Sequence, residues 1–189
     1  MTGTFTEWQN AVYEAPIILP MPDDVVPSAV LVVVTNEPHP HLVLTRRAAH
    51  LKKHAGQISF PGGRVDDTDK GLIDTALREA YEEIGLERDK VRFCGFLPDM
   101  LTGTGYRITP VVAQSHLSAV ELQAHLVVNH DEVEDILFVP LDLVLGKQNY
   151  DSFRREDKDV SWRSWRVCYQ GHVIWGATAA ILHQWANRL

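Results

Sequence analysis

The sequence has little cysteine and no long hydrophobic run. Its 189 residues include two cysteines, Cys94 and Cys168, too few for a disulfide framework or a zinc cluster. The longest purely apolar run, Ala29 to Val34, is six residues long, whereas a helix that spans a bilayer needs about 20. The first ten residues, MTGTFTEWQN, lack the basic region and the apolar core of a signal peptide. These absences predict a cytoplasmic protein with no leader and no membrane partner.

Positive charge is also scarce, because 18 Lys and Arg stand against 25 Asp and Glu, which gives a net charge of −7. This balance argues against nucleic acid as a partner. The charges are segregated along the chain. Residues 38–65 hold no acid, whereas residues 66–89 hold nine. A basic segment suited to phosphate therefore precedes an acidic segment suited to metal ions, unless both are only solvated surfaces.

Strand and helix patterns follow one another irregularly, which predicts an α+β fold rather than a doubly wound sheet. We expect a lead-in at 1–27, made of a short helix over 5–13 and a proline-rich extended segment, followed by one domain at 28–189. The clearest helix covers 72–84 and ends before Gly85, where a capping glycine belongs. Strands are expected at 29–35, 42–45, 57–60, 91–97, 106–113 and 136–139, a short helix at 140–145, a hairpin at 167–175 and a closing helix at 178–189.

Three carboxylates gather on the expected helix at 72–84. Glu79, Glu82 and Glu83 stand at positions i, i+3 and i+4 and therefore share one face. A Gly62-Gly63 turn precedes the helix, and glycine lets the backbone approach a ligand and offer a carbonyl. Oxygen ligands of this kind suit Mg²⁺ or Mn²⁺ rather than zinc. The alternative is a solvated acidic stripe. The other face carries the apolar residues Ile73, Ala76, Leu77, Ala80 and Ile84.

Residues 63–86, GRVDDTDKGLIDTALREAYEEIGL, resemble the Nudix box of the Nudix hydrolase superfamily, with the core Arg-Glu-apolar-x-Glu-Glu-x-Gly-apolar complete from Arg78 to Leu86. The spacing from Gly63 to Arg78 is one residue longer than usual, and Asp69 stands near the usual upstream glutamate. The resemblance implies an α/β/α sandwich with a mixed central sheet, in which the box forms a loop, a helix and a loop. It also implies metal-dependent attack of water on a diphosphate. The implied metal ligands are Glu79, Glu82, Glu83 and the Gly63 carbonyl, with Arg78 pairing to one glutamate, and the general base is Glu79, Glu83, Glu132 or Asp135.

Residues 42–63, LVLTRRAAHLKKHAGQISFPGG, are similar to the motif that precedes the box in coenzyme A diphosphatases of this superfamily. The segments GYRITPVVA at 105–113 and WGATAAIL at 175–182 also look typical of them. This resemblance implies hydrolysis of coenzyme A and acyl-CoA to 3′,5′-ADP and (acyl-)4′-phosphopantetheine, with a homodimer left open. Tyr106 or Phe60 either stacks an adenine or packs in the core. The substrate-binding residues implied are Arg47, Lys52, Lys53, His54, Gly62 and Gly63.

Other functions are weighed against this one. A Nudix hydrolase of different specificity would act on ADP-ribose, NADH, dinucleoside polyphosphates or noncanonical nucleoside triphosphates. A non-catalytic Nudix module would only bind a nucleotide, but such modules usually lose a box glutamate, and none is lost here. His50 and His54 have the spacing of a zinc pair but lack the glutamate of a zinc protease motif. No Gly-x-Ser-x-Gly motif of a serine hydrolase is present.

Overall fold

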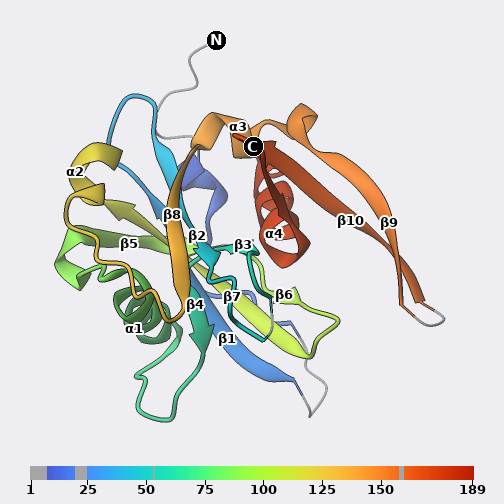
Figure 1. Cartoon of the computed structure of the whole chain (residues 1–189), viewed down its shortest axis with the longest axis horizontal. Coiled ribbons are helices and arrows are strands. Elements are labelled where there is room, and N and C mark those ends of the chain that lie inside the picture. The colour runs from blue at the N-terminus through green and yellow to red at the C-terminus, as the bar shows by residue number, and fades with distance from the viewer. Residues whose placement is uncertain (1–7, 20–24, 53, 158–159) are drawn as a thin grey trace.

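A mixed β-sheet forms the centre of the protein, and helices cover both of its faces (Figure 1). The computed structural model describes residues 8–19, 25–52, 54–157 and 160–189, with the side chains of 155–162 excepted. In these residues the main sheet has eight strands, and its principal order is β3-β2-β1-β7-β5. Only the β1–β7 pair is parallel, so the predicted mixed sheet is confirmed. The strands are β1 (Val26–Val34), β2 (His41–Arg47), β3 (Ile58–Ser59), β4 (Gly62–Arg64), β5 (Val91–Phe96), β6 (Met100–Leu101), β7 (Tyr106–Ser115) and β8 (Val133–Pro140).

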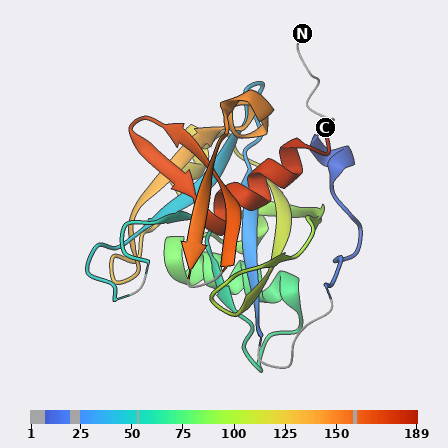
Figure 2. The same ribbon diagram turned by 90° about the vertical axis from the view of Figure 1, so that its right-hand side faces the viewer.

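The central strand β1 is buried on both faces. Its odd-numbered residues from Ala29 to Val33 pack beneath α1 (Leu72–Ile84), and the even-numbered ones from Val30 to Val34 face the core beneath α4 (Gly176–Ala186). Side chains alternate along a strand, so a continuous apolar run can serve two cores at once. Figure 2 shows α4 and α1 at different depths, with the sheet between them. The predicted α/β/α layering is therefore present.

Helix α1 has the predicted bounds. Ala76, Ala80 and Ile84 are fully buried against the sheet, as the apolar spacing predicts. Gly85 adopts the left-handed conformation with φ 66° and donates its backbone N–H to the carbonyl of Tyr81 at 2.9 Å. This cap ends the helix because a residue with a Cβ is disfavoured there. The polar face of α1 is left free to carry the glutamates.

A second sheet of three strands packs beside α4 (Figure 1). The predicted hairpin around Gln170-Gly171 is confirmed as β10 (Val160–Tyr169) and β11 (His172–Trp175), whereas β9 (Asp151–Asp157) was not predicted. The short helix at Leu141–Leu145 (α3) is confirmed, and a further one covers Ala119–Gln123 (α2). Short 3₁₀ turns lie at Arg88–Lys90 and Lys147–Asn149. No helix in the described ranges is long and apolar enough to cross a membrane.

The segment that precedes β1 packs against the C-terminal helix. Its predicted helix is a single 3₁₀ turn at Trp8–Ala11, and residues 5–7 lie outside the described part. Trp8 meets Trp185 edge to face with ring centroids 6.0 Å apart, and Arg188 Nε donates to the Ala11 carbonyl at 2.8 Å. These contacts tie the lead-in to α4. The division of the chain at residues 27 and 28 stays a prediction.

Candidate active site

The three glutamates of the box differ strongly in exposure. The side chain of Glu83 is 3% exposed, that of Glu79 17% and that of Glu82 50%. The face they share therefore runs from the sheet surface outward to solvent. Glu83 Oε2 is buried and has no hydrogen-bond partner in the described residues, a costly state for a carboxylate oxygen. Such an oxygen is suited to a cation.

Electrostatics of the cluster oppose ionisation of its two inner carboxylates, those of Glu79 and Glu83. Burial raises the pKa of Glu83 to about 8; nearby Arg47 opposes this, and Glu132 and Glu79 add to it. Burial also raises the pKa of Glu79, and the adjacent Arg78 guanidinium acts in the other direction. Glu132 contributes to both shifts, so its carboxylate lies within electrostatic range of Glu79 and Glu83. A bound divalent cation would supply the positive charge that this arrangement lacks.

The two glycines before α1 allow close approach of the backbone. Gly62 has φ +154°, and a Cβ there would lie 2.5 Å from the Ala29 carbonyl oxygen. A Cβ on Gly63 would overlap the Glu79 carboxylate. The predicted Gly-Gly turn is therefore a short strand, β4, pressed between β1 and α1. The missing side chain at Gly63 leaves room for the carboxylate beside the main chain.

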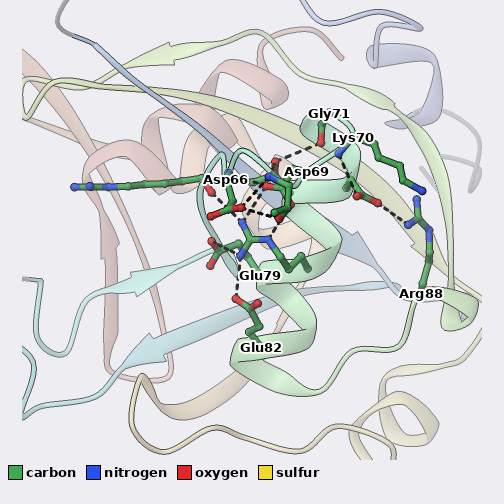
Figure 3. Close-up of polar contacts among 12 residues, drawn as sticks. Asp66, Asp69, Lys70, Gly71, Glu79, Glu82 and Arg88 are labelled. Atoms are coloured by element: carbon green, nitrogen blue, oxygen red, sulfur yellow. Dashed lines mark hydrogen bonds and ion pairs between the residues drawn. The ribbon is translucent and has the colours of Figure 1, made fainter.

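Arg78 is the centre of the polar contacts in the box. Its Nη1 donates to Glu79 Oε1 and Glu82 Oε2, both at 3.0 Å, and its Nη2 donates to the Arg64 carbonyl at 3.0 Å. Figure 3 shows Asp69, Glu79 and Glu82 directed toward one another, and all three accept hydrogen bonds from this guanidinium. We predicted a pair with one glutamate, and the structure shows contacts with two glutamates and an aspartate.

Asp69 anchors that guanidinium. Arg78 Nε donates to Oδ1 at 2.9 Å and Nη2 to Oδ2 at 3.0 Å, and the hydroxyl of Thr75 adds a bond of 2.8 Å to Oδ2. Arg78 lowers the pKa of Asp69 below its ordinary range by these bonds, and Asp69 in turn raises the pKa of Arg78. These contacts identify Asp69 as the anchor of Arg78.

The loop before β8 brings a further carboxylate to the cluster. Asn129 N–H donates to the Glu83 carbonyl, and the Glu132 carbonyl accepts from Ala48 N–H, both at 2.9 Å. These bonds tie the loop to α1 and to the end of β2. Asp135, the other downstream candidate, lies on β8 with its carboxylate 3.8 Å from Arg46. Glu132 is therefore the downstream acid that the fold brings to the glutamates.

The predicted substrate residues are not all brought together. Arg47 Nη1 lies 3.8 Å from Glu83 Oε1. Lys52 and His54 lie in the exposed loop after β2, where the His54 ring is bonded to Gln57 at 2.6 Å, and Lys53 lies outside the described residues. Phe60 is 3% exposed and packs in the core. Of the basic residues predicted to bind substrate, Arg47 is the one that the described structure brings to the carboxylates.

The donor set fits a hard divalent cation. Its members are carboxylate oxygens and the main chain at Gly63, the ligands that Mg²⁺ and Mn²⁺ prefer. Within the described residues no three His, Cys, Asp or Glu side chains are arranged to hold an ion. Glu79 and Glu82 instead both accept a hydrogen bond from Nη1 of Arg78. The orphaned oxygen of Glu83 and the Glu79 carboxylate beside the main chain of Gly63 are nevertheless features that a cation site needs.

A surface depression of about 540 Å³ lies elsewhere, at the N-terminal end of α1. Gly71, Phe96 and Pro16 line it, together with Asp74 and Arg88. Lys70 also lines it, and Asp74 and Arg88 pair with each other at 2.7 Å. Asp74 and Arg88 already neutralise each other in this depression, and the carboxylate cluster remains the candidate site.

Comparisons with known proteins agree with this geometry. A family model described as the NUDIX domain matches residues 25–160. A curated protein of Pectobacterium atrosepticum, named Uncharacterized Nudix hydrolase NudL, is 43% identical over 162 residues, which cover 86% of this chain and 82% of that protein. The protein of the same name from Escherichia fergusonii is 41% identical over 165 residues, with the same coverage.

A solved structure shares the fold. The crystal structure of a Nudix hydrolase from M. smegmatis, RenU, superimposes with a TM-score of 0.51 at 21% identity and covers 63% of this chain and 73% of that one. Nudix hydrolases generally use divalent metal cations and act on phosphorus-containing anhydrides of nucleoside diphosphate derivatives. With the family match, the complete box and the mixed sheet in agreement, the chain belongs to the Nudix hydrolase family.

Proposed function

We propose that this protein hydrolyses the diphosphate of coenzyme A and of acyl-CoA, with 3′,5′-ADP and 4′-phosphopantetheine or its acyl form as products. The observation that carries the proposal is the position of residues 42–63, the segment similar to the coenzyme A diphosphatase motif. Two residues of this segment lie at the box glutamates, because Arg47 Nη1 is 3.8 Å from Glu83 Oε1 and the main chain of Gly63 abuts the Glu79 carboxylate. A segment typical of one substrate class thus borders the reacting centre.

The proposed metal ligands are the carboxylates of Glu79, Glu82 and Glu83 and the carbonyl of Gly63. When bound, Mg²⁺ or Mn²⁺ supplies charge neutralisation at the diphosphate and lowers the pKa of a water molecule. Arg78 holds the rotamers of Glu79 and Glu82 through bonds of 3.0 Å. Asp69 fixes Arg78 in turn. In this arrangement Arg78 holds Glu79 and Glu82, and a bound cation would have to draw Glu79 away from it.

Water must lose a proton as its oxygen bonds to one phosphorus and the bridging P–O bond breaks. We propose Glu132 as the acceptor of that proton. Its carboxylate influences Glu79 and Glu83, and the described residues show no ion pair that occupies it. Glu79 and Glu83 stay as the other candidates. A base within hydrogen-bond reach of the water contributes about 10²–10⁴-fold to the rate.

The substrate is tested with a panel of diphosphate compounds in Mg²⁺ or Mn²⁺, with products separated by chromatography. The panel holds coenzyme A, acetyl-CoA, ADP-ribose, NADH, diadenosine polyphosphates and 8-oxo-dGTP. We expect release of 3′,5′-ADP from coenzyme A with the highest kcat/KM. Preferred turnover of ADP-ribose or of a triphosphate would overturn the substrate and keep the family reaction.

The same panel separates an enzyme from a binding module. Glu83→Gln keeps the shape of the side chain but removes its charge. We expect its turnover to fall by about 10³-fold or more, because a metal ligand is lost, while nucleotide binding without cation persists. Full turnover in Glu83→Gln would refute the metal site, and no turnover of any compound by the unaltered chain would favour a non-catalytic module.

A further inference from the structure

Arg64 directly follows Gly63, yet the two residues face opposite sides of the sheet. Side chains alternate along a strand, and the Cβ position of Gly63 in β4 points at Glu79 on the α1 side. Arg64 therefore points to the α4 side, where it stands opposite Ser28 of β1 in the antiparallel ladder. Its main chain is fixed because its carbonyl accepts a bond of 3.0 Å from Arg78. The side chain thus starts beside the carboxylates and leads away from them.

The Arg64 guanidinium is held in place without a counter-charge. Its Nη2 donates to the Tyr106 hydroxyl at 2.5 Å, and its carbon lies 5.3 Å from the centre of that ring. No carboxylate pairs with it in the described ranges. Arg47, by contrast, has Glu83 at 3.8 Å, and Arg78 has three acids. A fixed guanidinium with free donors matches the geometry of phosphate oxygens.

A second polar group on the same face lacks a partner. Ser28 is 5% exposed, and its Oγ is buried and unbonded within the part of the chain that the structure describes. A buried hydroxyl without a partner is rare, because its desolvation is not repaid. Ser28 lies directly across the ladder from Arg64, at the spacing where cross-strand side chains interact. Ser28 and Arg64 therefore place a hydroxyl and a guanidinium on the same face of the sheet.

We propose that Arg64, oriented by Tyr106 and joined by Ser28, binds a phosphate monoester of the substrate that is distinct from the scissile diphosphate. The charge stands on the face of the sheet opposite the glutamates, so the group that it would bind is one other than the reacting diphosphate. This inference rests on the proposed function, under which the monoester is the 3′-phosphate of coenzyme A. Arg64 is then the residue that distinguishes coenzyme A from dephospho-CoA.

The test compares kcat/KM for coenzyme A with kcat/KM for dephospho-CoA. In Arg64→Gln we expect the ratio of the two to fall about 10- to 100-fold, the range for a lost charge-assisted hydrogen bond. Arg64→Lys keeps the charge and should restore part of the ratio. Tyr106→Phe should lower the ratio by only about 3-fold, since it removes one neutral hydrogen bond. Arg92→Gln is the matched control, because Arg92 also bonds a neutral partner, Gln114 at 3.0 Å, on strand β5.

An unchanged ratio in Arg64→Gln overturns the inference, and so does an equal loss for both substrates, which would place Arg64 at the diphosphate. Inhibition supplies a second readout, because 3′,5′-ADP should inhibit Arg64→Gln more weakly than the unaltered protein, whereas AMP should inhibit both equally. If the unaltered protein does not turn over coenzyme A, the proposed function fails. If it does and the ratio is unmoved, only the role of Arg64 fails.

Discussion

Asp69→Asn should weaken the fold and the site together. The Asp69 side chain is 2% exposed and accepts four hydrogen bonds, two of them from Arg78. Asparagine keeps the shape, but its amide hydrogens would meet the hydrogens of the guanidinium. Removal of one partner of a buried ion pair costs about 3–5 kcal/mol. Arg78 keeps Glu79 and Glu82 as partners, so we expect a loss of about 3 kcal/mol, at the low end of that range.

Urea unfolding, followed by circular dichroism, measures this loss of unfolding free energy. The matched control is Asp74→Asn in the first turn of α1, whose partner Arg88 is 66% exposed and lies 2.7 Å away. Exposed pairs contribute little because water screens them, so this control should lose much less stability than Asp69→Asn. Equal losses in the two variants would refute the view of Asp69 as a buried anchor.

The pH dependence of stability tests the role of Asp69 further, because its direction can be predicted. Hydrogen bonds from Arg78 lower the pKa of Asp69 below its ordinary value of 3.8. A carboxylate with a lowered folded-state pKa stabilises the fold fully above the unfolded pKa and loses that contribution as pH falls. The stability difference between the unaltered protein and Asp69→Asn should therefore be constant above about pH 5 and shrink below about pH 4. A difference that grows on acidification would contradict the assignment.

Three further variants probe the cluster. Gly63→Ala should abolish most turnover and weaken Mn²⁺ binding, because its Cβ displaces the Glu79 carboxylate, whereas Gly103→Ala, with open space around it, should change neither. Burial raises the pKa of Glu83 to about 8 from 4.5. With EDTA present, the unaltered protein should therefore lose stability relative to Glu83→Gln as pH rises across that window. Mg²⁺ should reverse the order of the two stabilities. Glu132→Gln should lower kcat about 100-fold with little change in Mn²⁺ affinity, and a matching loss of affinity, measured by titration, would make it a ligand instead.

Local rules were enough to predict the box helix. The apolar spacing of α1 decides which face is buried, and Gly85 decides where the helix ends, so its bounds follow from residues within it. Other elements depend on partners far along the chain. Strand β4 holds two glycines with no strand preference, and pairing with β1 creates it. The short helix α2 did carry a local signal, the capping box of Ser118 and Glu121.

The features of the site also divide into those that local rules predict and those that depend on distant parts of the chain. The spacing of Glu79, Glu82 and Glu83 predicted their shared face, because helical geometry alone sets it. The targets of Arg46, Arg47 and Arg64 could not be predicted, since each reaches an acid or a phenol distant in sequence. A register shift in the β2–β8 pairing separates Arg46 from Arg47, and the first meets Glu134 while the second meets Glu83. The number of basic residues in a segment does not tell which acid each of them contacts.

The central claim is that the carboxylates of Glu79, Glu82 and Glu83 and the Gly63 carbonyl form the cation site of this hydrolase, with Glu79 and Glu83 as its two inner carboxylates. Crystals grown with Mn²⁺ test it most directly, through the anomalous scattering of the ion. We predict an anomalous peak in contact with both carboxylates and the Gly63 carbonyl, with Glu79 turned away from Arg78. A peak only at another place, or no peak at saturating Mn²⁺, would contradict the account.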